Sequence, residues 1–347
     1  MKKRLYIRTY LNKEALVKYP LPLKEKISRE GKKKRVIVIA GPTASGKTKL
    51  SLDLAGFIGG EIVSADSAQI YRGMDIGTAK ATPAERALFA HHLIDVRDID
   101  EPFNVAEFYN CCQEAFRDII LRDNVPLVVG GSGFYIHTLL YGPPPAPPSE
   151  PDVRDLLDRQ MREMGPGVLF ERLQILDPEY AATISENDRH KIIRALEIIA
   201  ISDRKVSDFP KPAKLMDQEY DFRCWFIYYP RETLNPRIED RCEEMLRQGF
   251  LEEVKALDQK GIRLNSAASQ AIGYRQALEY LDSPQTEADY LAFVSDFKRA
   301  SRQYAKRQFT WFRKEPLFRW LNIEEHTRNH SREHIQELIL QDFEQGT

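Results

Sequence analysis

The sequence predicts an α/β fold in which a parallel sheet carries helices on both faces and a helical domain is inserted into the chain. Three observations favour this class. The apolar run 36–40 leads directly into the glycine-rich segment 41–48. Short apolar runs then alternate with amphipathic stretches as far as residue 141, which is the pattern of strand–helix units in a parallel sheet. The proline-rich segment 142–149 interrupts this alternation, and three helical patterns follow it, over 152–164, 168–176 and 188–201.

The segment from Gly41 to Thr48 predicts a phosphate-binding loop between the first strand and a helix over 47–58. It reads Gly-Pro-Thr-Ala-Ser-Gly-Lys-Thr, which matches the P-loop pattern in full. Backbone N–H groups of such a loop line a concavity that fits a diphosphate, and the positive end of the following helix faces the anion. We expect Lys47 to lie among the phosphate oxygens and Thr48 to offer its hydroxyl to Mg²⁺. The core is therefore predicted to be P-loop NTPase-like.

A short strand over 60–65 leads into the polar cluster Asp66-Ser67-Ala68-Gln69. Ligands gather at the carboxyl ends of strands in open α/β sheets, so we expect this cluster in the same crevice as the phosphate loop. A carboxylate at Asp66 can take a proton from a nucleophile that attacks a group whose diphosphate lies in the loop. The plainer alternative is that Asp66 caps a helix. The glycine-punctuated loop 73–80 is predicted to cover a ligand.

The next predicted elements are a short strand over 91–95, a helix over 104–121 and an apolar strand over 125–129. Gly130-Gly131-Ser132-Gly133 then predicts a second turn at which the backbone approaches a ligand. Nucleotide hydrolases and kinases hold Mg²⁺ partly through an acid at the end of a strand. No carboxylate follows Val129 at the end of the apolar strand, so Asp95 is the alternative candidate for the acid that holds Mg²⁺. His91 and His92 are expected to be packed in the fold, since no third metal ligand accompanies them.

The proline-rich segment marks the clearest boundary, because repeated prolines neither continue a helix nor enter a central strand. A buried-strand pattern returns at 223–229 and indicates that the chain rejoins the sheet. We therefore expect a basic, poorly ordered extension over 1–35, a first core segment over 36–141, a helical insertion over 142–215, a second core segment over 216–320 and a tail over 321–347.

The second core segment is predicted to be helical after its strand. The helices are expected over 235–248, 251–260 and 287–313. The last of these carries one apolar side, made by Phe293, Phe297, Ala300, Tyr304 and Trp311. Its remaining surface is strongly basic, with Lys298, Arg299, Arg302, Lys306, Arg307 and Arg313. That surface is either solvated or a contact for nucleic acid.

Composition excludes several classes of protein. The formal net charge is −1, so a nucleic-acid partner has to be met by local basic surface. No apolar run is long enough for a membrane span, and the charged start contains no signal-peptide core, which predicts a cytoplasmic protein. The four cysteines include no Cys-x-x-Cys pair, which favours reduced structural thiols over a disulfide framework or a zinc site.

These motifs together resemble the tRNA dimethylallyltransferases, also called tRNA isopentenyltransferases. The resemblance extends from about Val36 to Trp320. It rests on the segments 41–48, 66–71 (Asp-Ser-Ala-Gln-Ile-Tyr), 73–80 (Gly-Met-Asp-Ile-Gly-Thr-Ala-Lys), 130–135 (Gly-Gly-Ser-Gly-Phe-Tyr), 187–188 with 194–197, 273–276 (Gly-Tyr-Arg-Gln), 305–308 and 310–313.

The resemblance implies transfer of a dimethylallyl group from dimethylallyl diphosphate to N6 of the adenosine 3′-adjacent to the anticodon of tRNA, with release of diphosphate. It implies Mg²⁺ as the cofactor and a helical insertion that binds the anticodon stem-loop. We expect the protein to be a monomer. The implied catalytic residues are Asp66 as general base, Thr43, Lys47 and Arg231. The implied diphosphate ligands are Gly41, Thr43, Ala44, Ser45, Gly46, Lys47, Thr48 and Arg231, the last completing the clamp from the far side. The implied tRNA contacts are Asp66, Ser67, Ala68, Gln69, Ser132, His190, Lys191 and Arg194.

The chain departs from the family pattern at two places. Ser132 stands where threonine is more frequent, which keeps a hydroxyl. Arg-His-Lys at 189–191 replaces Pro-Gln-Arg, which makes Arg194 a stronger candidate for a phosphate contact than His190 or Lys191.

Two other functions stay open on the residues alone. A P-loop kinase for a small molecule or nucleotide would consume ATP without RNA. An adenine-nucleotide isopentenyltransferase would run the same chemistry on a small acceptor, but it would need neither the helical insertion nor the basic helix.

Overall fold

The computed structural model describes residues 34–210, 219–329 and 332–345. The prediction that the basic extension is poorly ordered concerns residues 1–33, which lie outside the described residues. The chain divides into two compact units. The sheet unit contains the described residues of Met1–Leu140 and Asp217–Thr347, and the helical unit contains those of Tyr141–Met216. Each unit is described by itself below.

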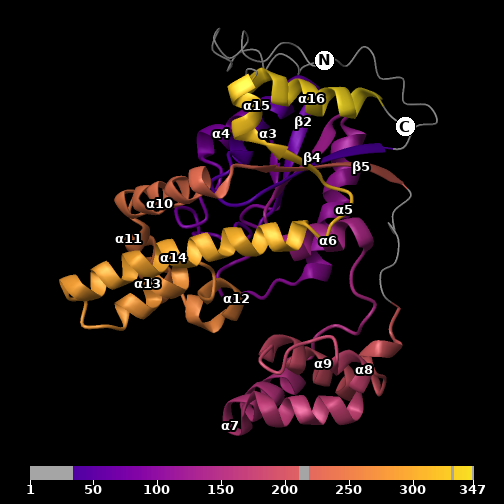
Figure 1. Ribbon diagram of the computed structural model, residues 1–347, viewed down its shortest axis with the longest axis vertical. Helices are drawn as coiled ribbons and strands as arrows, with labels where there is room; N and C mark the ends of the chain where they lie inside the picture. Colours follow the sequence, from indigo (N-terminus) through magenta and orange to yellow (C-terminus); the bar gives the residue numbers. More distant parts are fainter. Residues whose placement is uncertain (1–33, 211–218, 330–331, 346–347) are drawn as a thin grey trace. The chain divides into compact units, whose positions relative to one another are not determined.

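The sheet unit is built on six parallel strands in the order β3-β2-β4-β1-β5-β6, of which Figure 1 labels β2, β4 and β5. The strands are β1 (Lys34–Ala40), β2 (Gly60–Ala65), β3 (His91–His92), β4 (Val125–Gly130), β5 (Tyr220–Tyr228) and β6 (Arg319–Asn322). Central β1 is fully buried from Val36 to Ala40, as expected for a parallel strand covered on both faces. The predicted α/β class is confirmed.

Helices cover both faces of the sheet because parallel crossovers are right-handed. The crossover from β1 through α3 to β2 and the crossover from β3 through α5 to β4 run in opposite directions along the sheet, so α3 and α5 lie on opposite faces. The helices of the sheet unit are α3 (Lys47–Ile58), α4 (Pro83–Leu88), α5 (Val105–Leu121), α6 (Gly133–Tyr141), α10 (Arg231–Arg247), α11 (Phe250–Gln259), η2 (Ile262–Leu264), α12 (Ser266–Ser269), α13 (Tyr274–Leu281), α14 (Glu287–Phe312), α15 (Ile323–Asn329) and α16 (Arg332–Gln345). No helix among these and the other described elements is both long and apolar enough to cross a bilayer.

Two boundaries of the sheet unit differ from the sequence prediction. Lys34 and Arg35 were assigned to the basic extension but belong to β1, where Lys34 is in register with Tyr220. The predicted tail 321–347 instead contains the end of β6 and two helices. Asp342 of α16 accepts hydrogen bonds from Arg223 Nη1 and Trp225 Nε1, both at 3.2 Å, which fixes this helix on the sheet. β6 is only four residues long and gives too short a pattern to predict.

The helical unit contains α7 (Pro151–Leu176), α8 (Pro178–Ala181), α9 (Arg189–Ser202) and η1 (Val206–Asp208). Its core is formed by the buried faces of α7 and α9, with Leu157, Leu173 and Leu196 among the residues packed there. The prediction of two helices over 152–164 and 168–176 corresponds to one helix with a kink at Gly165, whose φ of 83° and ψ of 167° interrupt the helical backbone. Pro166 follows directly and cannot supply the missing N–H.

Candidate active site

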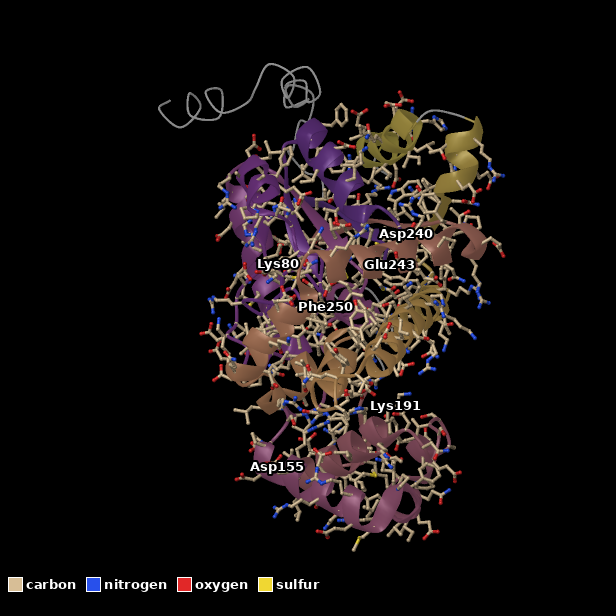
Figure 2. The ribbon with its side chains drawn as sticks, turned by 90° about the vertical axis from the view of Figure 1, so that its left-hand side faces the viewer. Lys80, Asp155, Lys191, Asp240, Glu243 and Phe250 are labelled. Atoms are coloured by element: carbon tan, nitrogen blue, oxygen red, sulfur yellow. The ribbon has the colours of Figure 1, made fainter. Side chains whose placement is uncertain are left out.

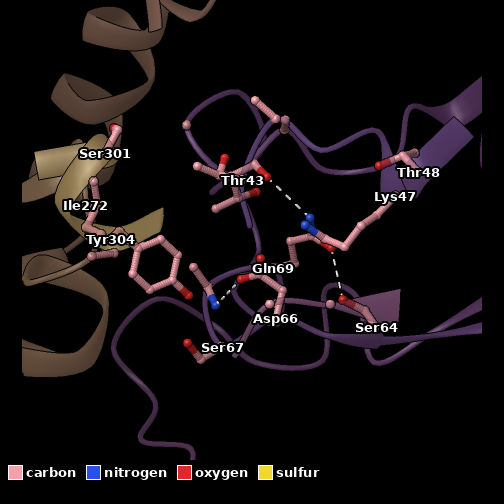
Figure 3. Close-up of a pocket in the computed structure, with 18 of the residues that line it drawn as sticks. Thr43, Lys47, Thr48, Ser64, Asp66, Ser67, Gln69, Ile272, Ser301 and Tyr304 are labelled. Carbon is pink, nitrogen blue, oxygen red and sulfur yellow. Dashed lines mark hydrogen bonds between the residues drawn. The ribbon is translucent and has the colours of Figure 1, made fainter. Parts of the chain in front are cut away.

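A cavity of about 480 Å³ lies in the sheet unit at the carboxyl ends of β1, β2 and β4. The phosphate loop, the cluster from Asp66 to Gln69, and residues of α10 and α14 line it (Figure 3). The loop and the polar cluster come from neighbouring parts of one parallel sheet, whose strands all end at the same edge. The prediction that they share one crevice is confirmed.

The phosphate loop has the backbone that an anion site requires. Gly46 at the N-cap of α3 has a φ of +89° and Ala44 has a φ of +62°, so successive N–H groups turn toward the same side. A Cβ at Gly41 would lie 2.4 Å from the carbonyl oxygen of Ile227, which explains the need for glycine where the loop passes β5. Ser45 Oγ is fully buried and has no hydrogen-bond partner among the described residues. The loop thus keeps polar groups free for a ligand.

Lys47 points into this loop. Its Nζ donates hydrogen bonds to the carbonyl oxygens of Gly41 at 2.9 Å and Pro42 at 2.7 Å. Burial of the ammonium group and the nearby Arg241 guanidinium lower the pKa of Lys47 to about 7, and the charge of Asp66 opposes this shift. A bound anion would reverse the balance and favour the charged ammonium.

The arginines around the loop differ from the sequence prediction. Arg231, the predicted far-side clamp, is the exposed first residue of α10 and does not line the cavity. Two later arginines of the same helix lie closer to the loop. Arg237 donates from Nε to the carbonyl oxygen of Ala44 at 3.1 Å, and Arg241 lines the cavity with a buried Nε that has no hydrogen-bond partner in the described chain. Burial lowers the pKa of Arg241, while Asp66 raises it.

The spacing of these two arginines is a signal that the sequence reasoning missed. Arg237 and Arg241 are four residues apart, so they share one face of α10. Arg231, the first residue of α10, lies six residues before Arg237 and is not part of this pair. An i, i+4 search for basic residues within the predicted helix 235–248 would have found them.

Asp66 sits in a tight turn beside the loop. Its Oδ1 accepts a hydrogen bond from the backbone N–H of Ala68 at 2.9 Å, which orients the carboxylate through the main chain. The backbone N–H of Ser67 donates to Ser132 Oγ at 3.0 Å, so the second glycine-rich turn supports the first cluster. Tyr304 of α14 points its ring toward this turn (Figure 3). Burial and the nearby charge of Asp66 raise the pKa of Tyr304, which keeps its phenol protonated.

Gln69 is held by groups of its own chain segment. Its Oε1 accepts from Ser64 Oγ at 2.9 Å and its Nε2 donates to the carbonyl oxygen of Thr78 at 3.3 Å. Both ends of the amide are therefore engaged, which fixes its position at the edge of the cavity. Ala68 also lines the cavity next to it.

The loop 73–80 is ordered by an internal carboxylate. Glu253 of α11 accepts hydrogen bonds from the backbone N–H groups of Asp75 at 2.9 Å, Ile76 at 2.6 Å and Gly77 at 3.1 Å. Glu253 also accepts from the hydroxyl of Tyr274 at 2.6 Å. The loop thus presents a rigid inner edge to the cavity.

Asp95 cannot serve as the alternative magnesium ligand. Its Oδ1 accepts a hydrogen bond from Lys80 at 2.7 Å and its Oδ2 accepts one from Arg86 at 2.6 Å, so both carboxylate oxygens are already paired with cationic side chains. Lys80 is labelled in Figure 2. Burial alone would raise the pKa of Asp95, but these hydrogen bonds hold it below its usual value. The two histidines are packed as predicted: His92 contacts Glu61 at 2.7 Å through Nε2, and His91 contacts the carbonyl oxygen of Phe89 at 2.8 Å through Nδ1.

The three predicted tRNA contacts of the helical unit lie on α9. His190 and Lys191 are exposed, and Lys191, labelled in Figure 2, forms an ion pair with Asp188 at 2.9 Å. Arg194 donates to Glu197 at 2.7 Å and to the carbonyl oxygen of Pro147. Arg194 therefore ties the proline-rich segment to α9 and still has about a third of its side chain exposed.

Comparison with known proteins gives a consistent result. The family model for IPP transferases matches residues 69–315. The chain is 55% identical over 312 residues to the tRNA dimethylallyltransferase of Protochlamydia amoebophila (strain UWE25), with 90% of each protein covered. Among solved structures, the tRNA isopentenylpyrophosphate transferase of Bacillus halodurans is similar with a TM-score of 0.62 at 35% identity, covering 89% of this chain and 96% of that one. A eukaryotic dimethylallyltransferase acting on tRNA is similar with a TM-score of 0.69 at 26% identity, covering 89% of this chain and 84% of that one.

Proposed function

The chain belongs to the tRNA dimethylallyltransferase (IPP transferase) family, and from this premise we propose how its cavity carries out the transfer of a dimethylallyl group to tRNA. The donor is dimethylallyl diphosphate, and the acceptor is N6 of the adenosine 3′-adjacent to the anticodon. The observation that carries this proposal is the placement of Asp66 in the same cavity as a complete phosphate loop.

The phosphate loop binds the diphosphate of the donor. Its N–H groups, the Lys47 ammonium and the Arg241 guanidinium face the same cavity, and Arg237 fixes the loop through Ala44. These groups neutralise the charge that grows on the leaving diphosphate while the allylic carbon–oxygen bond breaks. The electron pair of that bond leaves with the diphosphate.

Asp66 acts on the acceptor. The exocyclic amine of adenine is a weak nucleophile because its lone pair is delocalised into the ring. As the N6–carbon bond forms, one N6 proton passes to the Asp66 carboxylate, which is already oriented by the N–H of Ala68. The target base has to leave its stack to reach this position, so the polar groups of Ser67 and Ser132 at the cavity are suited to contact it.

Mg²⁺ is expected to bind together with the donor. No group of three or more potential histidine, cysteine or acidic ligands occurs among the described residues. Mg²⁺ usually keeps several waters and takes phosphate oxygens with few protein ligands, so a single protein hydroxyl beside a bound diphosphate fits this ion. The hydroxyl of Thr48, exposed in the first turn of α3 and lining the cavity, is the protein group that would hold it. When bound, the ion supplies further charge neutralisation for the diphosphate.

The helical unit and the basic part of α14 are proposed to bind the anticodon stem-loop. Lys191 supplies an exposed cationic group on α9, the Arg194 guanidinium of the same helix is partly exposed, and Arg307 lines the cavity from α14. Phosphate contacts of this kind fix the position of an RNA without reading its sequence. A tRNA substrate also favours the cytoplasm as the place of action, and we propose a monomer as the active form.

The proposal is tested by incubating the protein with unmodified tRNA, Mg²⁺ and dimethylallyl diphosphate. Digestion of the tRNA and mass spectrometry should find one dimethylallyl group on one adenosine, with one diphosphate released for each modified nucleoside. Release of diphosphate without modified adenosine would contradict the acceptor assignment. Modification of free adenine nucleotides in preference to tRNA would favour the small-acceptor alternative.

A further inference from the structure

Asn265 lies outside the cavity but joins two stretches of chain that line it. It is 6% exposed and precedes α12. Its Oδ1 accepts hydrogen bonds from the backbone N–H groups of Ala267 at 3.0 Å and Ala268 at 3.3 Å. Its Nδ2 donates to the carbonyl oxygens of Ile99 at 3.0 Å and Glu101 at 2.9 Å, which belong to a segment 164 positions away or more. Both donors and both acceptor lone pairs of the amide are therefore used.

One of the two stretches is α12 with the residues that follow it. Ala267, Gln270, Ala271 and Ile272 line the cavity, and Ile272 is labelled among the lining residues in Figure 3. α12 has only four residues, and so short a helix is not stable by itself. Its position therefore depends on tertiary contacts and on the cap that Asn265 supplies.

The other stretch is the loop 94–103. Both of its ends line the cavity, through Ile94 and Phe103. The Phe103 ring packs edge-on against Tyr135, another lining residue, with the ring centroids 6.4 Å apart. Asn265 holds two carbonyl groups between these ends, so the middle of the loop is fixed to the start of α12.

The loop 94–103 is also paired with the chain that carries the polar cluster 66–69. The backbone N–H of Asp95 donates to the carbonyl oxygen of Gln69 at 3.2 Å, and the N–H of the next residue donates to that of Ile70 at 2.8 Å. A shift of the loop would therefore be passed on to the polar cluster. Asn265 thus connects this cluster to α12 through a continuous series of hydrogen bonds.

We propose that Asn265 is a positioning residue for the transfer, which fixes α12 relative to the polar cluster 66–69. This inference rests on the proposed function, since it assumes that the acceptor adenosine meets Asp66 in this cavity. Transfer needs N6 and the allylic carbon in line and in contact, and a misplacement of about 1 Å can cost about 100-fold in rate. None of the hydrogen bonds that Asn265 makes in the described chain reaches the phosphate loop, so diphosphate binding should not depend on it.

Two substitutions separate the two functions of the amide. Asparagine and aspartate cap helices about equally well, so Asn265→Asp keeps the cap of α12. Its carboxylate cannot donate to the carbonyl oxygens of Ile99 and Glu101, so the link to the loop is lost. Asn265→Ser also supplies a capping oxygen, adds no charge, and lacks the amide that donates to the loop.

Asn322→Asp is the matched control. Asn322 Oδ1 accepts hydrogen bonds from the backbone N–H groups of Glu324 at 3.1 Å and Glu325 at 3.4 Å, so it caps α15 as Asn265 caps α12. Asn322 does not line the cavity. The control therefore makes the same chemical change at the same kind of cap, away from the site.

Two quantities are measured for each protein. The first is the single-turnover rate constant of transfer, with protein in excess over unmodified tRNA and saturating dimethylallyl diphosphate. This constant does not depend on the fraction of protein that is folded. The second is the inhibition constant of inorganic diphosphate against the donor. Both Asn265 variants should lower the rate constant by at least about 10-fold and keep the inhibition constant within about 2-fold, and Asn322→Asp should change neither.

Three results would overturn the inference. Both Asn265 variants could keep the wild-type rate constant, or Asn322→Asp could lower it as much as they do. The inhibition constant could also rise in proportion to the loss of rate, which would mean that the substitutions act through the phosphate loop. Thermal unfolding shows which variants are folded, and either Asn265 variant is sufficient for the test. Absence of transfer by the wild-type protein would instead contradict the proposed function, so the two failures are distinguishable.

Discussion

The side-chain amide of Gln308 joins α14 to the phosphate loop through the backbone N–H of Thr43, which donates to Gln308 Oε1 at 3.1 Å. The other end of the amide, Nε2, donates to the carbonyl oxygen of Gly131 at 3.0 Å. One buried side chain therefore holds the loop after β1 and the turn after β4 at a fixed separation. The basic helix is thus part of the catalytic framework as well as a candidate RNA surface.

Gln308→Ala should loosen the phosphate loop and weaken donor binding. A hydrogen bond contributes about 0.5–1.5 kcal/mol net, so loss of the contact to Thr43 should raise KM for the donor by about 3- to 10-fold with a smaller effect on kcat. Steady-state kinetics with saturating tRNA measures this. Gln303→Ala, at an exposed position of the same helix, is the control and should change neither constant. Equal kinetics for both variants would show that the Gln308 contact does not support the site.

Asp66→Asn should lower kcat by about 10²- to 10⁴-fold, which is the usual contribution of a positioned general base. Asparagine keeps the Oδ1 that accepts from the N–H of Ala68, so the turn should remain intact. Single-turnover rates and tRNA affinity should be measured on the same preparation. We expect the affinity to stay within a few-fold of wild type, because the base acts mainly in the transition state.

The control for Asp66→Asn is Asp100→Asn, at an exposed position in the loop before α5. It removes the same charge from the protein without touching the cavity, so its rate should equal that of wild type. If Asp66→Asn also retained the wild-type rate, Asp66 would have no part in proton transfer.

Lys47 should make donor capture depend on pH. Its pKa is lowered to about 7 in the free protein, so the ammonium is present below that pH and is lost as the pH rises. Since the diphosphate needs the charged form, kcat/KM for the donor should fall above about pH 7, while kcat should vary less because the bound diphosphate restores the charge. Lys47→Arg, which stays charged, should flatten the profile. A profile for wild type that is flat through pH 7 would contradict this assignment.

The same shift has a consequence for folding. Between about pH 7 and the ordinary lysine pKa of 10.5, the unfolded chain holds a proton on Lys47 that the folded chain has lost. The contribution of Lys47 to the free energy of unfolding should therefore rise with pH across this window. The contribution of Lys47 is obtained by measuring the free energy of unfolding by chemical denaturation across this pH range, in wild type and in Lys47→Met. Identical pH dependence in the two proteins would show that the shift is absent.

Glu253→Ala should destabilise the loop 73–80. The substitution removes the acceptor of three backbone N–H groups, including that of Ile76 at 2.6 Å. Leaving a polar group without its partner costs about 1–3 kcal/mol, so the free energy of unfolding should fall by at least that amount. Denaturant unfolding gives the value. Glu252→Ala, the exposed neighbour, should have little effect, and equal losses for both variants would argue against a special role of Glu253.

Much of the sheet could be predicted because its signals are local. The apolar run before Gly41 and the pattern of the loop itself occupy one continuous stretch. Asp66 could be placed in the crevice because it follows a strand directly. Gln308 could not be predicted as a partner of Thr43, since the two residues are 265 positions apart and neither forms a recognisable motif for that contact.

Other parts were mispredicted for physical reasons that can be named. Arg231 was predicted to bind the diphosphate, but it is the first residue of α10 and does not line the cavity. Arg241, ten residues later in the same helix, lines the cavity instead. Asp95 follows an apolar pair as a metal ligand would, yet its carboxylate accepts a hydrogen bond from the buried Lys80, 15 positions earlier, once the loop 73–80 has folded back. Such tertiary ion pairs leave no periodic signal in the sequence.

Arg194→Met tests the RNA surface of the helical unit. If Arg194 contacts a phosphate, the slope of log binding constant against log salt concentration should become shallower by about one unit. Filter binding of tRNA across a salt series measures the slope. Arg162→Met neutralises an exposed arginine of α7 in the same unit and should leave it unchanged. An unchanged slope for Arg194→Met, together with lower thermal stability, would assign Arg194 only to its contacts with Glu197 and Pro147.

The most direct test of the central claim follows two labels in one reaction. The protein is given unmodified tRNA, Mg²⁺, dimethylallyl diphosphate labelled in its allylic carbons and ATP labelled in its terminal phosphate. If the phosphate loop holds a leaving diphosphate, the carbon label enters tRNA and the phosphate label stays in ATP. Consumption of labelled ATP without carbon label in the RNA would contradict the account and favour a kinase.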